Sequence, residues 1–281
     1  MNPRRALIAL IASRIAATPL TALAQAGGKK MRRIGSLALA HSSPASEVLR
    51  GNFVAGMRDL GYVEGRDFTL VRVDAGGQTE RVPVAAAELV ASGVDLILTS
   101  STRLTLAAKN ATSTIPIVMF FVSDPAVTGL VASLAHPGGN ITGIADFDTE
   151  LVGKRVELLR EAVPNLSRLA VIHNPDYPTT RNDLVEVETA ARRFKLGLMP
   201  IELRQARNTE SAVEQAAKSR SDGSIVIGGA HESVQLFDSL ARWHLPNVGI
   251  GSAARIGAML SYGSEAVSFS VVDIGVTAAD A

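Results

Sequence analysis

The side chains with the most chemical potential stand in short polar loops, each of which follows a run of apolar residues. The residues that we select as candidate ligand contacts are Ser43, Ser101, Thr102 and Asp124 in the first half of the chain and Asn174, Asp176, Tyr177 and His231 in the second. Hydroxyl groups and the N–H groups of a helix N-terminus suit a carboxylate or another small polar ligand. Each of these residues also suits a helix cap, so capping is the alternative explanation for any one of them.

A catalytic or metal-binding centre has no counterpart in the sequence. The chain contains no cysteine, which excludes disulfides, thiol nucleophiles and cysteine-ligated metals. Its five histidines lack the spacing of metal ligands, and neither H-E-x-x-H nor G-x-S-x-G occurs. Residues 249–254 match the G-x-G-x-x-A pattern of dinucleotide sites, but Gly257 interrupts the helix that should follow. We therefore predict a binding protein with no cofactor, no metal ion and no enzymatic activity.

The elements that must position the loops are short apolar runs alternating with amphipathic segments. In residues 30–145 we predict strands over 34–40, 68–73, 94–98 and 115–122 and helices over 44–60, 79–91 and 102–112. In residues 146–263 we predict strands over 169–172, 198–203, 224–227 and 247–250 and helices over 151–163, 184–194, 208–219 and 232–243. This alternation predicts two doubly wound α/β lobes with parallel sheets, joined by a hinge near residues 140–150.

The selected residues follow the predicted strands, so they should gather at the carboxyl ends of the two sheets. Ligands of open α/β sheets bind at that edge. We therefore expect the binding site in the cleft between the lobes. Asp146 and Asp148 lie near the lobe boundary, and we interpret them as a solvated turn rather than as an acid–base pair.

The composition is that of a folded domain with little affinity for nucleic acid. Hydrophobic residues make up 47% of the 281 residues and charged residues 20%, which is enough apolar material for a core. The net charge is +1, whereas nucleic-acid-binding domains usually carry a stronger basic excess. We predict no nucleic-acid partner.

The first residues have the pattern of an export signal. Arg4 and Arg5 form a basic start, residues 6–24 are mostly apolar or small, and Ala22-Leu23-Ala24 fits the small-x-small cleavage pattern. Arg14 interrupts the apolar run, so an amphipathic or disordered tail is the alternative, and the sequence leaves Sec and twin-arginine export open. We predict that residues 1–24 are a signal peptide and that the mature protein is periplasmic.

Three stretches carry a family resemblance. They are Gly61-Tyr62-Val63-Glu64-Gly65, then Asp124-Pro125 with Pro137-Gly138-Gly139-Asn140, and then Lys154-Arg155 with Asn174-Pro175. In this order they resemble the ABC transporter substrate-binding proteins that include tryptophan- and tyrosine-type binders. The resemblance implies the type I periplasmic-binding-protein fold, in which two lobes close on a ligand. It also implies a small polar ligand, with an amino acid as one candidate, and delivery to ABC permease subunits in the inner membrane.

The chain departs from the family pattern at three places. His231 stands where relatives often carry an aspartate that could hold a ligand ammonium, and Tyr177 stands where many carry asparagine. Residues 264–281 show no resemblance, and we expect them to be a divergent tail of a truncated chain. Two alternatives to a solute-binding protein remain. The first is a degenerate copy that binds no ligand, and the second is a ligand sensor built on the same fold. A DNA-binding regulator would need a helix-turn-helix before residue 30, and the first 30 residues cannot form one.

Overall fold

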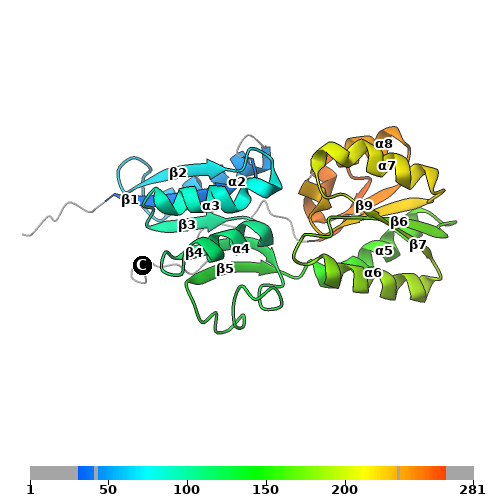
Figure 1. Ribbon diagram of the computed structural model, residues 1–281, viewed down its shortest axis with the longest axis horizontal. Coiled ribbons are helices and arrows are strands. Elements are labelled where there is room, and N and C mark those ends of the chain that lie inside the picture. Colours follow the sequence, from blue (N-terminus) through cyan, green and yellow to red (C-terminus); the bar gives the residue numbers. More distant parts are fainter. Residues whose placement is uncertain (1–30, 41–43, 233–234, 264–281) are drawn as a thin grey trace, which may run out of the picture. The chain divides into compact units, whose positions relative to one another are not determined.

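The computed structural model describes residues 31–40, 44–232 and 235–263. These residues form two five-stranded parallel sheets, each covered by helices on both faces (Figure 1). The strands of the first sheet are β1 (Arg32–Ala38), β2 (Phe68–Asp74), β3 (Leu96–Thr99), β4 (Ile117–Ser123) and β5 (Ile141–Asp146), in the order β2-β1-β3-β4-β5. The fold class predicted from the alternation of elements is confirmed.

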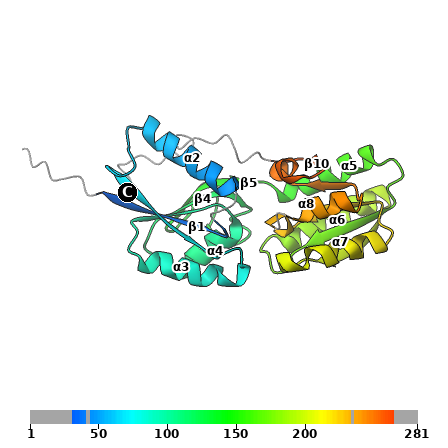
Figure 2. The same cartoon turned by 90° about the horizontal axis from the view of Figure 1, so that it is seen from above.

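Helices cover both faces of the first sheet because its strands bury side chains on both sides. The helices are α2 (Pro44–Asp59), α3 (Val82–Ala91) and α4 (Thr102–Ala111). Figure 2 shows α2 on one side of the sheet and α3 and α4 on the other. On β3, Ile97 packs in the cluster beneath α3 and α4, while Leu98 packs in the cluster beneath α2. Successive side chains of one strand therefore belong to opposite layers of the core.

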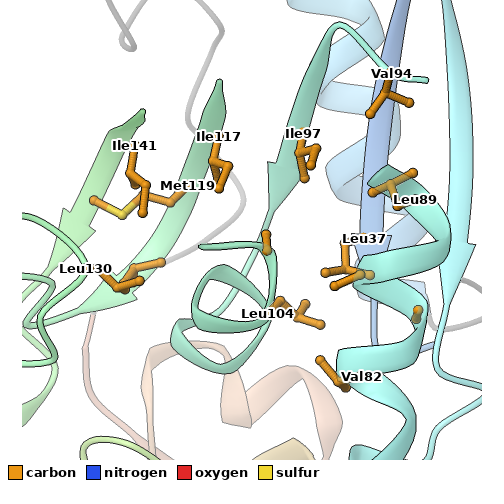
Figure 3. Packing of buried hydrophobic residues seen from close by; sticks show 14 of the residues in the cluster. Leu37, Val82, Leu89, Val94, Ile97, Leu104, Ile117, Met119, Leu130 and Ile141 are labelled. Carbon is orange, nitrogen blue, oxygen red and sulfur yellow. The ribbon is translucent and has the colours of Figure 1, made fainter. Parts of the chain in front are cut away.

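The core beneath α3 and α4 is made of aliphatic side chains. Leu89 from α3 and Leu104 from α4 pack against strand residues such as Leu37, Ile97 and Ile117 (Figure 3). Each of these five side chains is at most 4% exposed. Burial of this kind stabilises a fold by roughly 1.5–3 kcal/mol for each large aliphatic side chain.

The second sheet repeats the arrangement. Its strands are β6 (Arg168–His173), β7 (Gly197–Glu202), β8 (Gly223–Ile227), β9 (Asn247–Gly249) and β10 (Leu260–Ser261), in the order β10-β9-β8-β6-β7. Its helices are α5 (Val152–Ala162), α6 (Thr180–Phe194), α7 (Thr209–Lys218) and α8 (Leu236–Arg242). In Figure 1, α7 and α8 lie above these strands and α5 and α6 below them. The two core clusters of this lobe divide in the same way.

Three elements differ from the sequence prediction. β5 and β10 were not predicted, because β5 lies at the edge of its sheet with exposed Thr142 and Gly143, and β10 has only two residues. The predicted helix over 232–243 was wrong at its start. Ala230–Glu232 is a 3₁₀ turn, and α8 begins at Leu236.

The predicted signal peptide and the predicted tail over 264–281 lie outside the described residues. Within the part of the chain that the structure describes, no helix is long and apolar enough to span a bilayer.

We expect Gly143→Ala to lower the free energy of unfolding by at least about 2 kcal/mol, because it adds both strain and overlap. Gly143 has a φ of +141°, and a Cβ there would lie 2.0 Å from the carbonyl oxygen of Met119 on β4. Urea unfolding measures the loss. Gly139→Ala is the control, since no atom lies within 4 Å of a Cβ at that position. Equal stability of the two variants would contradict the close contact between β4 and β5.

Candidate functional site

The predicted site residues gather at the carboxyl ends of the two sheets. In the first lobe, Ser101 and Thr102 follow β3 and Asp124 follows β4. In the second lobe, residues 174–177 follow β6, and the turn that contains His231 follows β8. The strands within each sheet are parallel, so these ends share one edge. The predicted residue Ser43 lies outside the described residues.

The start of α4 carries hydroxyl groups. Ser101 is the N-cap, and its side chain accepts a long 3.4 Å hydrogen bond from the backbone N–H of Leu104. Thr102 begins the helix and is 1% exposed. Within the described chain its Oγ1 is buried and has no hydrogen-bond partner. A buried hydroxyl without a partner costs free energy, so this atom is suited to receive a ligand.

Tyr177 and His231 lie next to each other in the second lobe. Their ring centroids are 6.5 Å apart with an angle of 70° between the planes, an edge-to-face contact. The backbone of Gly229 lies beneath the tyrosine, since a Cβ there would come within 2.2 Å of Tyr177 Cδ2. The guanidinium carbon of Arg103, on the first turn of α4, lies 5.1 Å from the Tyr177 ring centroid. This distance is that of a cation–π contact.

His231 is neutral at pH 7. Burial lowers the pKa of its imidazole to about 4; the charge of Asp148 opposes this shift, and those of Arg155 and Arg103 add to it. Among the described residues, its buried Nδ1 has no hydrogen-bond partner. A neutral imidazole offers a donor at one ring nitrogen and an acceptor at the other. His231 can therefore either donate a hydrogen bond to a ligand or accept one from it.

Asn174 and Asp176 hold the loop after β6. Asn174 is buried, and its Oδ1 accepts a 3.0 Å hydrogen bond from the backbone N–H of Asp176. The hydroxyl of Thr180 donates to the carbonyl of Asn174 at 2.6 Å. Both carboxylate oxygens of Asp176 accept from Nη1 of Arg204 at 2.6 Å, in an exposed pair. These contacts fix the backbone that carries Tyr177.

Asp124 closes a turn at the end of β4. Its φ is +49°, and its carbonyl accepts from the backbone N–H of Thr128 at 2.9 Å and from the Thr128 hydroxyl at 3.0 Å. Its carboxylate charge acts on Asp146, the last residue of β5. Asp124 thus has a structural role in the turn whatever else it contacts.

The interpretation of Asp146 and Asp148 as a solvated turn was wrong. Asp146 accepts a hydrogen bond from the Ser123 hydroxyl at 2.5 Å, and burial raises the pKa of its carboxyl. Asp148 pairs with the guanidinium of Arg155 on α5, whose side chain is fully buried. Both carboxylates are partly buried. Such groups require partners of this kind, because desolvating a free charge is costly.

Asp183, a fully buried carboxylate, adjoins this pair. Its Oδ1 accepts from the Thr149 hydroxyl at 2.7 Å and its Oδ2 from the Thr179 hydroxyl at 3.0 Å. Burial raises the pKa of Asp183 to about 6, against the effect of these two hydrogen bonds. Asp183 is therefore an acid that titrates near neutral pH.

Sequence reasoning missed Arg103, Arg155 and Asp183 as members of this region. Arg155 had a detectable signal. It shares a stripe with the apolar residues Val152, Val156 and Leu159 on α5, and all four are buried. Arg103 and Asp183 stand in the first turns of helices, where charged residues are common. Their positions in the sequence therefore did not indicate a role in the site. No group of three or more metal-ligating His, Asp or Glu side chains occurs in the described ranges.

Comparisons with known proteins agree with this architecture. A family model described as ABC transporter substrate binding protein matches residues 37–280. The match continues past Gly263, where the resemblance was expected to end. The chain is 29% identical over 191 residues to a tyrosine-binding protein of Clostridioides difficile, which covers 68% of this chain and 53% of the relative. The chain thus spans about half the length of this curated relative.

Solved structures give the same fold. A conserved domain protein of Vibrio cholerae is 26% identical with a TM-score of 0.75, covering 85% of this chain and 80% of the other. A domain of a Streptococcus pneumoniae protein in complex with L-Trp is 22% identical with a TM-score of 0.72, covering 82% and 78%. At this identity the second likeness shows the fold alone.

We expect Asp183→Asn to remove a pH dependence of stability. The folded state of the wild type holds a proton on Asp183 up to about pH 6, whereas the pKa of an unperturbed aspartate is 3.8. Asp183 should therefore lower the unfolding free energy of the wild type by about 2 kcal/mol as pH rises from 4 to 6.5, while His231 acts in the opposite direction. The variant should lack this contribution, so in urea unfolding at several pH values its unfolding free energy should rise more steeply with pH than that of the wild type.

Asp59→Asn, at the exposed end of α2, is the matched control and should keep the wild-type slope. Parallel profiles for the wild type and Asp183→Asn between pH 4 and 6.5 would contradict the raised pKa.

Proposed function

Because the chain belongs to the ABC transporter substrate-binding proteins, we propose that it is the exported solute-binding component of an ABC importer. It binds a small polar ligand between its two lobes and delivers it to permease subunits in the inner membrane. An amino acid is one candidate ligand. The protein converts nothing, and its role is capture and delivery.

One observation carries this proposal. The carboxyl ends of the two sheets bear buried polar atoms that have no partner in the described chain, Thr102 Oγ1 in the first lobe and His231 Nδ1 in the second. Native proteins leave few such atoms, and a ligand is one explanation for them. Binding between two lobes places one atom on each wall of the site.

The eight predicted residues divide by role in this proposal. Ser43, Ser101 and Thr102 supply hydroxyl or backbone donors from the first lobe, and Asp124 lies at the same edge. Tyr177 and His231 supply an aromatic face and a neutral imidazole from the second lobe. Asn174 and Asp176 act through the loop that they hold, since their side chains accept hydrogen bonds from the protein itself.

Export is part of the proposal. We expect N-terminal sequencing of protein from the periplasmic fraction to begin at Gln25 or Gly27, because the two small-x-small sites end at Ala24 and Ala26. A variant with Leu23→Lys and Ala24→Lys should accumulate unprocessed. Wild-type protein found in the cytoplasm with Met1 intact would contradict export.

Binding is tested with a panel of amino acids, including L-tyrosine and L-tryptophan, together with sugars and small organic acids. We expect one class to raise the melting temperature of the mature protein, since a ligand of the native state stabilises it in proportion to ln(1 + [L]/Kd). Tyr177→Ala and His231→Gln should each lower affinity by at least about tenfold, which is about 1.4 kcal/mol.

His136→Gln, a change at an exposed histidine on a turn of the first lobe, should leave affinity unchanged. If folded protein responds to no class of ligand, or if the two site variants bind as the wild type does, the proposed site is wrong.

A further inference from the structure

The charges around His231 favour an anion. Asp148, Arg155 and Arg103 are the charged groups of the described chain that act on its imidazole. Asp148 has the largest effect of the three, but it is paired with Arg155, and the net charge of the three groups is +1 because of Arg103. The imidazole of His231 is neutral, so it adds no charge of its own to this net charge. A ligand anion complements this net charge better than a ligand ammonium does.

The two buried polar atoms that have no partner in the described chain suit the same kind of group. Thr102 Oγ1 is a hydroxyl that can donate, and a neutral His231 can donate from Nδ1. Thr102 also stands on the first turn of α4, where backbone N–H groups and the helix dipole favour negative charge. Arg103, the next residue, brings a guanidinium to the face of Tyr177. Hydroxyl, imidazole and guanidinium donors together match a carboxylate.

Three carboxylates near these strand ends are paired or act elsewhere. Asp148 is paired with Arg155 through both of its oxygens. Asp176 directs both oxygens to Arg204 on the surface. The charge of Asp124 acts on Asp146 at the end of β5 and is not among those that act on His231.

We propose that the ligand of this site is a small organic acid that carries a carboxylate and no ammonium group, with the carboxylate bound by Thr102, Arg103 and His231. This inference rests on the proposed binding function and names its ligand class. Placing an anion beside the imidazole also has a consequence for protonation. The anion favours the charged ring, so the pKa of His231 rises on binding and the complex takes up a proton below neutral pH.

The experiment uses matched compounds and isothermal titration calorimetry on the mature protein. One series is 3-phenylpropanoate, L-phenylalanine, 2-phenylethylamine and the uncharged 3-phenylpropanamide. The other is 4-methylpentanoate, L-leucine, 3-methylbutylamine and 4-methylpentanamide. Within each series the carbon skeleton is nearly constant while the charged groups change. We expect the acid of at least one series to bind at least about tenfold more tightly than the amino acid, amine and amide.

Variants test whether Arg103 binds the carboxylate of the ligand. Arg103→Gln should weaken binding of the acid by at least about tenfold and leave the weak binding of the amide unchanged. Arg103→Lys keeps the charge and should retain part of the affinity. Arg242→Gln removes a surface arginine that pairs with Glu210 and should change nothing. Melting curves establish that each variant is folded.

Proton uptake gives a second readout. For the wild type, affinity for the acid should rise as pH is lowered from 7 to 5.5, and the His231 ring signal in NMR should titrate at higher pH in the complex. His231→Gln should show neither effect.

Tighter binding of the amino acid, amine or amide would overturn the inference and leave the binding function intact. The same holds if a sugar binds in a manner that depends on Tyr177. If no compound of either series binds to folded protein, the inference is also wrong, and the broader panel then decides the binding function separately.

Discussion

The buried guanidinium of Arg155 is the constraint on which the edge of the second lobe depends. Its side chain is fully buried on α5, and its Nε donates to the carbonyl of Tyr262 at 2.6 Å while its Nη atoms pair with Asp148. Asp148 lies just before α5, and Tyr262 directly follows β10. One side chain thus joins two segments that are more than one hundred residues apart in the sequence. A charge that is this deeply buried fixes its partners, because separating them would leave an unpaired ion away from water.

The same pair sets the electrostatics of the candidate site. The charges of Asp148 and Arg155 act on both Asp183 and His231, and they oppose each other at each of them. Burial therefore decides the protonation of both groups, and it favours the neutral form of each. Arg103 adds a cation from the first lobe to the charges that act on His231. The net positive charge of these three groups is therefore due to Arg103, which stands on α4 of the first lobe.

The burial of an element decides whether its position could be predicted from the sequence. Strands such as β6 and β8 are buried on both faces, so their apolar runs were visible and their place was predicted. β5 is half solvent-exposed at an edge and includes Gly143, so it has neither the run nor the alternation of a strand. The strand ends led to Thr102, Tyr177 and His231 because loop position follows from topology alone. Arg155 and Asp183 could not be found in this way, since their role depends on partners brought together by folding.

The neutral state of two buried groups also shapes the response of the protein to acid. Asp183 has a raised pKa of about 6, so its contribution to stability is complete below the pKa of an unfolded aspartate and is lost as pH rises through 6. His231 has a lowered pKa of about 4, so its contribution to stability is present above the ordinary histidine pKa of 6.5 and is lost as pH falls toward 4. The two effects oppose each other across one pH interval. Their sum is flatter than either, and the fold therefore tolerates both buried groups between pH 4 and 6.5 with little net change in stability from the pair.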